Sequence, residues 1–81
     1  MSNILSKTRR KIWREILTFL DQSKDLRHST EVAKEVGLAN DSAYYRLKSL
    51  AVEGLVQMQR TPYNVILWQI TEKGREWLKE S

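Results

Sequence analysis

The chain lacks cysteine entirely, and its 81 residues include only one proline, one histidine and three glycines. Without cysteine it can form neither a disulfide nor a thiolate metal site, which fits a cytosolic protein. No apolar run approaches the roughly 20 residues that span a bilayer. Residues 1–5 also lack the basic and apolar regions of a signal peptide, so we expect a cytoplasmic protein.

Catalytic groups are equally scarce. The single histidine, His28, stands in the polar segment 22–28, where an exposed loop residue is expected. An enzyme needs a nucleophile with its base or clustered carboxylates, and a metal site needs more ligands than one histidine and scattered acids. The three glycines are dispersed and form no phosphate-binding loop. We therefore expect no enzyme, no catalytic residue, no metal and no cofactor, so function must come from a binding surface.

Length and charge set the next limits. A chain of 81 residues provides one hydrophobic core, so residues 1–81 are expected to form a single domain. Fourteen lysines and arginines against ten acidic residues give a net charge of +4. This modest excess is compatible with nucleic acid binding, but the distribution of the charges matters more than their total.

The hydrophobic pattern predicts four helices and a hairpin. Apolar residues recur at three- and four-residue steps in segments that predict helices at about residues 7–21, 29–36, 40–53 and 72–79, with residues 1–5 flexible. The polar residues expected to cap these helices are Ser6, then Ser29 or Thr30, then Asn40 or Asp41, and Thr71. Gly37 and Gly54 are expected to end the second and third helices.

From Leu55 onward the apolar period becomes two, which is typical of strands. Two alternating segments flank the turn 61–64, where Pro62 suits the first central position of a type I turn. They predict a β-hairpin, and a further short strand is expected near Arg27 and His28. The predicted fold class is α+β and mostly α.

The order helix, helix, helix, hairpin, helix resembles the winged-helix superfamily. The segments that carry the resemblance to the helix-turn-helix core of MarR-like and ArsR-like regulators are Gly37-Leu38, Ser42-Ala43, Leu47-Lys48-Ser49-Leu50 and Glu53-Gly54-Leu55-Val56. The segment from Ile70 to Arg75 looks like the LTxKG entry into the helix after the wing. One departure is Ala39, which stands where such proteins often carry a capping serine or threonine.

This resemblance covers about residues 7–79 and implies a small transcriptional regulator that binds double-stranded DNA by occupying an operator. The implied architecture is a three-helix helix-turn-helix core, a β-hairpin wing and a C-terminal helix. Helix 40–53 would lie in the major groove, and the wing at 60–64 would lie on the minor groove or the backbone. No small-molecule ligand is evident from the residues.

The face of the third helix opposite its core residues would contact DNA. Steps of 100° per residue from Ala43, Leu47 and Leu50 direct six side chains away from the core, namely Asp41, Ser42, Tyr44, Tyr45, Lys48 and Ser49. Lys48 would contact guanine or a phosphate, and Tyr45 a thymine methyl group. Ser42 and Tyr44 offer hydroxyls to phosphates or bases. The alternative is an ordinary solvated helix face, against which the two adjacent tyrosines argue.

Two further surfaces carry positive charge. The first is a cluster before the first helix turns apolar, formed by Lys7, Arg9, Arg10, Lys11 and Arg14. Phosphate contact and a plain solvated helix face are both open for it. The second is the wing, where Arg60 and Tyr63 flank the turn and arginine suits a narrow minor groove. Its alternative is an ordinary hairpin tip, and Arg27 and His28 are weaker candidates for a backbone contact.

The tryptophans Trp13, Trp68 and Trp77 are expected to pack in the core or at an interface. A homodimer is expected, because one short helix reads few base pairs and two-fold symmetry doubles the site. The candidate dimer surfaces are Val65 and Leu67 with Trp77, or the first helix through Ile4, Leu5 and Trp13. Two other functions stay open, a winged-helix module that binds protein and a DNA-binding part of a replication or partition machinery.

Overall fold

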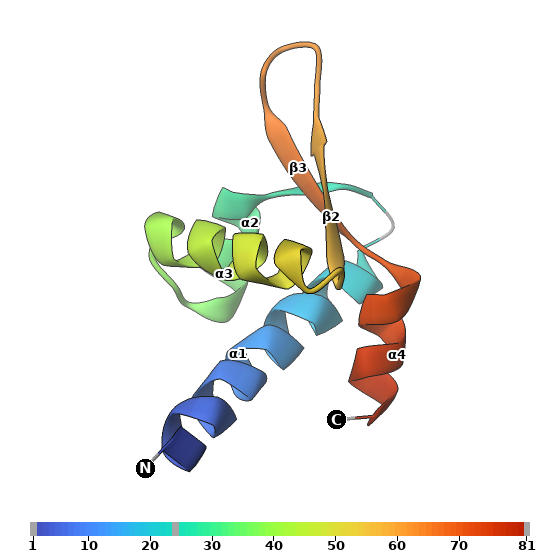
Figure 1. Cartoon of the computed structure of the whole chain (residues 1–81). Helices are drawn as coiled ribbons and strands as arrows, with labels where there is room; N and C mark the ends of the chain where they lie inside the picture. The colour runs from blue at the N-terminus through green and yellow to red at the C-terminus, as the bar shows by residue number, and fades with distance from the viewer. Residues whose placement is uncertain (1, 24, 81) are drawn as a thin grey trace.

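Figure 1 shows the computed structural model of the chain, which describes the backbone of residues 2–23 and 25–80 and the side chains of residues 9–23 and 25–80. Its elements are α1 (Ser2–Gln22), β1 (Arg27–His28), α2 (Ser29–Val36), α3 (Asn40–Val52), β2 (Val56–Arg60), β3 (Ile66–Ile70) and α4 (Glu72–Glu80). This order is the predicted one and makes the fold a winged helix.

The first helix is longer than its apolar pattern indicates. α1 begins at Ser2 and not near Lys7, so the predicted start and the predicted cap at Ser6 are both wrong. No glycine or proline precedes Ser6, so nothing in the local sequence stops the helix from extending toward its N-terminus. Although α1 has 21 residues, neither it nor any other described helix is long and apolar enough to cross a membrane.

The strands form one antiparallel sheet in the order β1-β3-β2. β2 and β3 pair from Val56 opposite Ile70 to Arg60 opposite Ile66. β1 extends the sheet on the other side of β3, with Arg27 opposite Trp68. The hairpin of β2 and β3 projects from the helices as the wing (Figure 1). The predicted hairpin and the predicted short strand are both confirmed.

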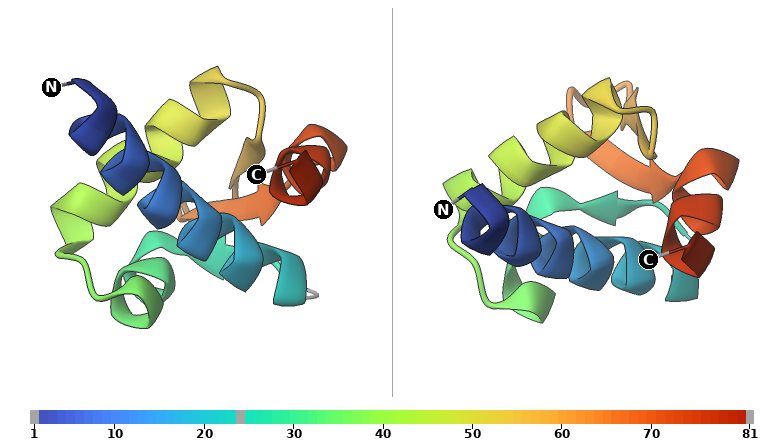
Figure 2. Two further views of the ribbon diagram at one scale, coloured as in Figure 1. Left: turned by 90° about the horizontal axis from the view of Figure 1, so that it is seen from below. Right: turned by 60° about the horizontal axis from the view of Figure 1, so that its bottom comes forward.

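One core lies between the helices and the sheet. Its largest fully buried side chains are Trp68, Ile16, Leu17, Leu47, Leu50 and Val32. They come from α1, α2, α3 and β3, so each of these elements buries its apolar stripe against the others. Figure 2 shows α1 crossing the base of the molecule between α2 and α3. Among the described side chains, none that is polar or charged is buried in this core.

The N-terminus of α2 is capped by His28, which corrects the prediction of Ser29 or Thr30. The Thr30 backbone N–H donates to His28 Nδ1 at 3.1 Å, and the His28 backbone N–H donates to Glu31 Oε1 at 3.0 Å. This reciprocal pair is a capping box with an imidazole in place of the usual hydroxyl. His28 takes the position because β1 ends there with extended backbone (φ −79°, ψ 152°) and α2 follows without a linker.

The turn between α2 and α3 is short and tightly bonded. Gly37 adopts a left-handed conformation with φ 71° and ends α2, as predicted. Leu38 N–H donates to Ala33 O at 2.9 Å. Ala39 then occupies the N-cap of α3 with no side-chain hydrogen bond, so the predicted caps Asn40 and Asp41 are wrong. The extended backbone that precedes a helix is found at residue 39. The N-cap of α3 is therefore one position earlier than the polar side chains of Asn40 and Asp41 suggest.

The junction between β3 and α4 depends on the hydroxyl of Thr71 and on the absence of a side chain at Gly74. Gly74 N–H donates to Thr71 Oγ1 at 3.1 Å, which confirms Thr71 as the cap of α4, and Thr71 Oγ1 donates to Gly54 O at 2.7 Å. Gly74 is buried, and a Cβ atom there would overlap Leu55 O and lie 2.8 Å from Ile70 Cγ1. The glycine therefore lets α4 approach the chain at the start of β2.

We expect Gly74→Ala to lower the free energy of unfolding by about 1–3 kcal/mol, because overpacking against the backbone of Leu55 outweighs the better helix propensity of alanine. Thermal and urea unfolding would measure the change. Glu76→Ala is the matched control in the same helix, since Glu76 is exposed and should change stability by less than about 0.5 kcal/mol. A Gly74→Ala protein as stable as the wild type would contradict this account.

The capping box should also make stability depend on pH through Glu31. The His28 backbone N–H and then the Arg27 side chain stabilise the carboxylate and lower the pKa of Glu31. A lowered pKa means that this stabilisation is complete above the ordinary glutamate pKa of about 4.3 and is lost as the pH falls through the folded value.

We therefore expect Glu31→Gln to be less stable than the wild type at neutral pH, by a few tenths to about 1 kcal/mol because Glu31 is largely exposed. The difference should shrink below about pH 4. Urea unfolding across pH measures it, and Glu35→Gln, a neighbouring exposed acid in the same helix, is the control. A stability difference that stays constant with pH would contradict the role of the ionised carboxylate.

Candidate nucleic-acid interface

The outward face of α3 carries hydroxyls and a cation. Ala43, Leu47 and Leu50 are fully buried, so the opposite side of this helix faces solvent. Tyr45 is 69% exposed. The other predicted contact residues that lie exposed on α3 are Ser42, Lys48 and Ser49, together with Asp41. Steps along the helix therefore predicted these orientations correctly.

Tyr44 is an exception to that prediction. It is half-buried and packs against the core, with its ring centroid 6.0 Å from that of Trp68 in an edge-to-face arrangement. The prediction that Tyr44 points away from the core is therefore wrong. It lies on the flank of α3 where its ring contacts Trp68 of β3.

Lys48 lies one helical turn after Tyr44 on the same flank. Its Nζ stands 5.6 Å from the centroid of the Tyr44 ring, within the range of a cation–π contact. The ring of Tyr45 also meets the Tyr44 ring edge-on, with centroids 6.3 Å apart. The two tyrosines therefore have different surroundings. Tyr45 faces solvent, whereas Tyr44 lies between Lys48 and Trp68 of the sheet.

The tip of the wing offers a tyrosine and a tethered arginine. Tyr63 is 88% exposed. Arg60 Nη1 donates to Asn64 Oδ1 at 3.2 Å, and Asn64 adopts a left-handed conformation with φ 67°. Thr61 Oγ1 accepts from the backbone N–H of Val65 at 3.1 Å, which helps to fix the turn. Arg60 and Tyr63 thus stand at the end of the hairpin that projects beside α3 (Figure 1).

The cations of α1 lie away from the wing. Exposed Arg9 and Arg10 line a cavity of about 320 Å³ with Trp13, Glu53 and Trp77, beside α4. Lys11 is exposed, and the Lys7 side chain lies outside the described residues. These arginines therefore lie on the side of the molecule formed by α1 and α4, and the wing tip lies on a different side.

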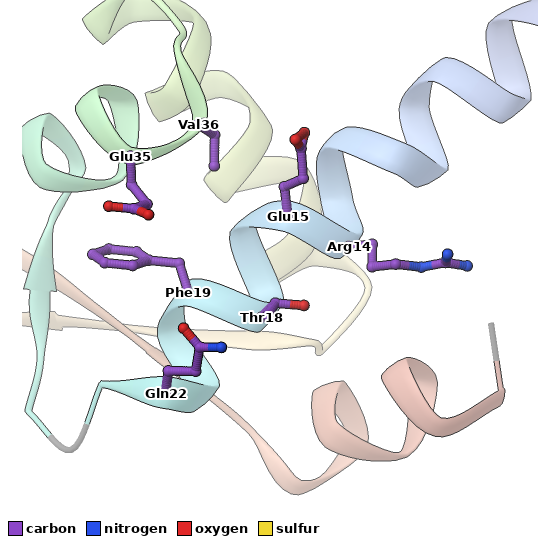
Figure 3. A pocket seen from close by; sticks show the side chains of 7 residues that line it. All are labelled: Arg14, Glu15, Thr18, Phe19, Gln22, Glu35 and Val36. Carbon is purple, nitrogen blue, oxygen red and sulfur yellow. The ribbon is translucent and has the colours of Figure 1, made fainter.

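Arg14 stands at the edge of a second cavity, between α1 and α2. The cavity has a volume of about 300 Å³, and its lining includes Phe19, Glu15 and Glu35. Figure 3 shows the Arg14 guanidinium pointing away from the Phe19 ring, whereas the Glu35 side chain extends toward that ring. The structure thus separates Arg14 from Arg60 and Lys48, although all three are exposed cations.

The weaker candidates before α2 are engaged in local contacts. Arg27 Nη1 pairs with Glu31 Oε2 at 3.0 Å, and its guanidinium lies 5.8 Å from the centroid of the Phe19 ring. His28 Nδ1 lies 2.8 Å from Thr30 Oγ1 in addition to accepting the capping hydrogen bond. Arg27 Nη1 and His28 Nδ1 therefore both stabilise the start of α2 through local contacts.

The structure also brings together polar residues that the sequence did not predict to share a site. Thr30, Glu31, Lys34 and Asn40 line a cavity of about 250 Å³ where α2 meets the start of α3. Arg46 is half-buried on α3, and Val52 at the end of α3 is 84% exposed. The cavity could not be found from sequence, because its residues come from two helices whose angle the turn decides. The described residues include no group of three or more potential metal ligands.

The wing, the helix-turn-helix and the exposed face of α3 together define the class of the fold, and comparisons with known proteins agree with it. No protein-family model matches the chain, and no curated protein matches it. Solved structures do match it, and they include transcriptional regulators of the MarR family. The chain therefore has the winged-helix fold seen in MarR-family structures.

Three of these structures illustrate the similarity. The regulator BldR from Sulfolobus solfataricus is 22% identical with a TM-score of 0.75, covering 86% of this chain and 50% of its own. ZitR from Lactococcus lactis, a zinc-responsive MarR family member, is 24% identical with a TM-score of 0.71, covering 85% and 48%. The repressor CouR, bound to a 23-mer DNA duplex, is 20% identical with a TM-score of 0.73, covering 99% and 68%.

A mutant of ZitR has also been solved in complex with DNA. The chain spans about half the length of BldR and ZitR. The similarity to these two regulators therefore extends over about 85% of this chain but leaves about half of each regulator without a counterpart in it.

Proposed function

We propose that this protein binds double-stranded DNA and acts as a transcriptional regulator by occupying its operator. The observation that carries the proposal is the exposed face of α3, where Tyr45, Lys48 and Ser49 stand opposite the buried side of the helix. A helix of this kind fits the major groove, where base edges present distinct donors and acceptors. Support comes from similar folds that have been solved on DNA duplexes.

In the proposed complex, α3 lies in the major groove and the wing lies on the neighbouring minor groove or backbone. Lys48 donates to guanine acceptors or a phosphate, Tyr45 contacts the bases, and the hydroxyls of Ser42 and Ser49 donate to phosphates. Arg60 and Tyr63 contact DNA from the wing tip. The mechanism is binding without catalysis, in the cytoplasm, and it requires no metal or cofactor.

The α1 arginines have a smaller part in this arrangement. Arg9 and Arg10 stand beside Trp77 of α4, and Arg14 stands at the α1–α2 cavity, so none of them lines the face shared by α3 and the wing. We infer that they add general positive potential and make few direct phosphate contacts. This inference separates the two interpretations that the charge cluster leaves open.

We expect fluorescence anisotropy with a mixed-sequence duplex to show saturable binding that weakens steeply as salt is added. The logarithm of affinity should fall linearly with the logarithm of salt concentration, by about 0.9 per phosphate contact. Lys48→Ala and Arg60→Ala should each weaken binding by about tenfold and lower the salt slope by up to about 1.

Two controls sharpen this measurement. Lys79→Ala removes an exposed cation of α4 and should leave affinity and slope unchanged. The double variant Arg9→Ala and Arg10→Ala should reduce the slope less than Lys48→Ala does. Wild-type protein that fails to bind duplex DNA even at low salt would overturn the proposed function and favour a module that binds protein through Tyr45 and the wing.

We also propose that the protein binds DNA as a homodimer, because a two-fold axis doubles the number of base pairs read. Support comes from Trp13 of one candidate surface and Trp77 of the other, since their rings lie 6.1 Å apart where α1 meets α4. Val65 adds an exposed apolar side chain on the wing, and Ile4 and Leu5 have side chains outside the described residues.

Sedimentation velocity should therefore give twice the monomer mass at micromolar protein concentrations. Trp13→Ala should shift the population toward monomer, whereas Val65→Ser should do so only if the wing forms the interface. Circular dichroism would establish that both variants remain folded. A wild-type monomer at several hundred micromolar would contradict the proposed dimer and leave DNA binding to be judged by the anisotropy measurement.

A further inference from the structure

Three side chains, those of Trp68, Tyr44 and Lys48, form a continuous stack from the wing strand β3 to the flank of α3. The Trp68 ring, in β3, is 1% exposed and meets the Tyr44 ring edge-to-face at 6.0 Å between centroids. The Tyr44 ring in turn carries Lys48 Nζ at 5.6 Å from its centroid. The buried indole therefore fixes the phenol ring, and the phenol ring lies against the cation.

The stack restricts a side chain that is otherwise flexible. A lysine has four rotatable bonds before its ammonium group, and fixing them costs conformational entropy whenever the ammonium binds a target. An aromatic ring under the ammonium favours the conformers that keep the charge over the ring. Because Tyr44 is anchored on Trp68, those conformers hold the Lys48 ammonium beside the Tyr44 ring before any ligand arrives.

We propose that Tyr44 is a positioning residue that holds Lys48 for its contact with DNA and makes that contact depend on the seating of the wing strand against α3. This inference rests on the proposed function, and it gives the Tyr44 ring a positioning role in place of the direct DNA contact that the sequence pattern gave to the Tyr44 hydroxyl. Tyr45 is next to Tyr44 in sequence but 69% exposed, and its ring meets the Tyr44 ring, whereas the Tyr44 ring meets the buried indole of Trp68. Pre-organisation of this kind strengthens binding by lowering the entropy cost.

The first experiment tests the stack in the free protein and needs no DNA. In the proton spectrum, the Tyr44 ring current should move the ε-methylene resonance of Lys48 upfield of the ordinary lysine position. Tyr44→Phe should keep this shift, and Tyr44→Leu should abolish it. Tyr63→Leu, which removes an 88% exposed tyrosine at the wing tip, is the matched control and should leave the Lys48 shift in place. An unshifted Lys48 resonance in the folded wild type would overturn the proposal.

The second experiment is a double-mutant cycle measured by anisotropy on one duplex at one salt concentration. Tyr44→Leu should weaken binding by about two- to fivefold, the range of a cation–π contact, and Tyr44→Phe should bind like the wild type. In the presence of Lys48→Ala, Tyr44→Leu should cause little further loss, because no cation is left to position. Thermal unfolding of each variant would identify any loss that comes from misfolding.

The outcomes separate the two proposals. Losses that add fully in the cycle, or a Tyr44→Phe variant as weak as Tyr44→Leu, would overturn the positioning role while DNA binding stands. A wild type that binds no duplex would overturn the proposed function, and the Lys48 resonance in the free protein would still decide whether the stack exists.

Discussion

The packing of Trp68 is the contact on which the rest of the structure depends. Its indole lies in the middle strand of the sheet, opposite Arg27 of β1 and Met58 of β2, and it is 1% exposed against the core. A two-stranded hairpin is marginally stable in water by itself, so the wing needs an attachment to the helices. Trp68 contributes to this attachment by its burial in the core and by its edge-to-face contact with Tyr44 of α3.

This attachment makes α3 and the wing one surface. The exposed residues of α3 and the tip residues Arg60 and Tyr63 are carried by elements that share the same buried core. The cations of this surface are restrained, because Lys48 lies over the Tyr44 ring and Arg60 donates to Asn64. A surface with restrained cations loses less entropy on binding than one with free side chains, and this favours recognition of a fixed pattern of acceptors.

The sequence predicted the order and type of the elements well. The spacing of apolar residues differs between helices and strands, and it can be found from the local sequence alone. It placed Gly37, the hairpin and the Thr71 cap correctly. The caps at α2 and α3 were wrong, because capping depends on which residue has extended backbone before the helix, and the turns decide that. A glycine inside a helix generally costs stability, whereas the missing Cβ of Gly74 allows α4 to approach Leu55.

The sequence by itself therefore determined the winged-helix order, the buried sides of the helices and the exposed face of α3. Only the tertiary structure decided that Tyr44 packs on Trp68 and that Arg9 and Arg10 stand beside α4, apart from the wing. The physical reason is that a 100° step per residue gives a side chain's direction relative to its own helix. It does not give the neighbour that covers that side chain, which depends on how separate elements pack.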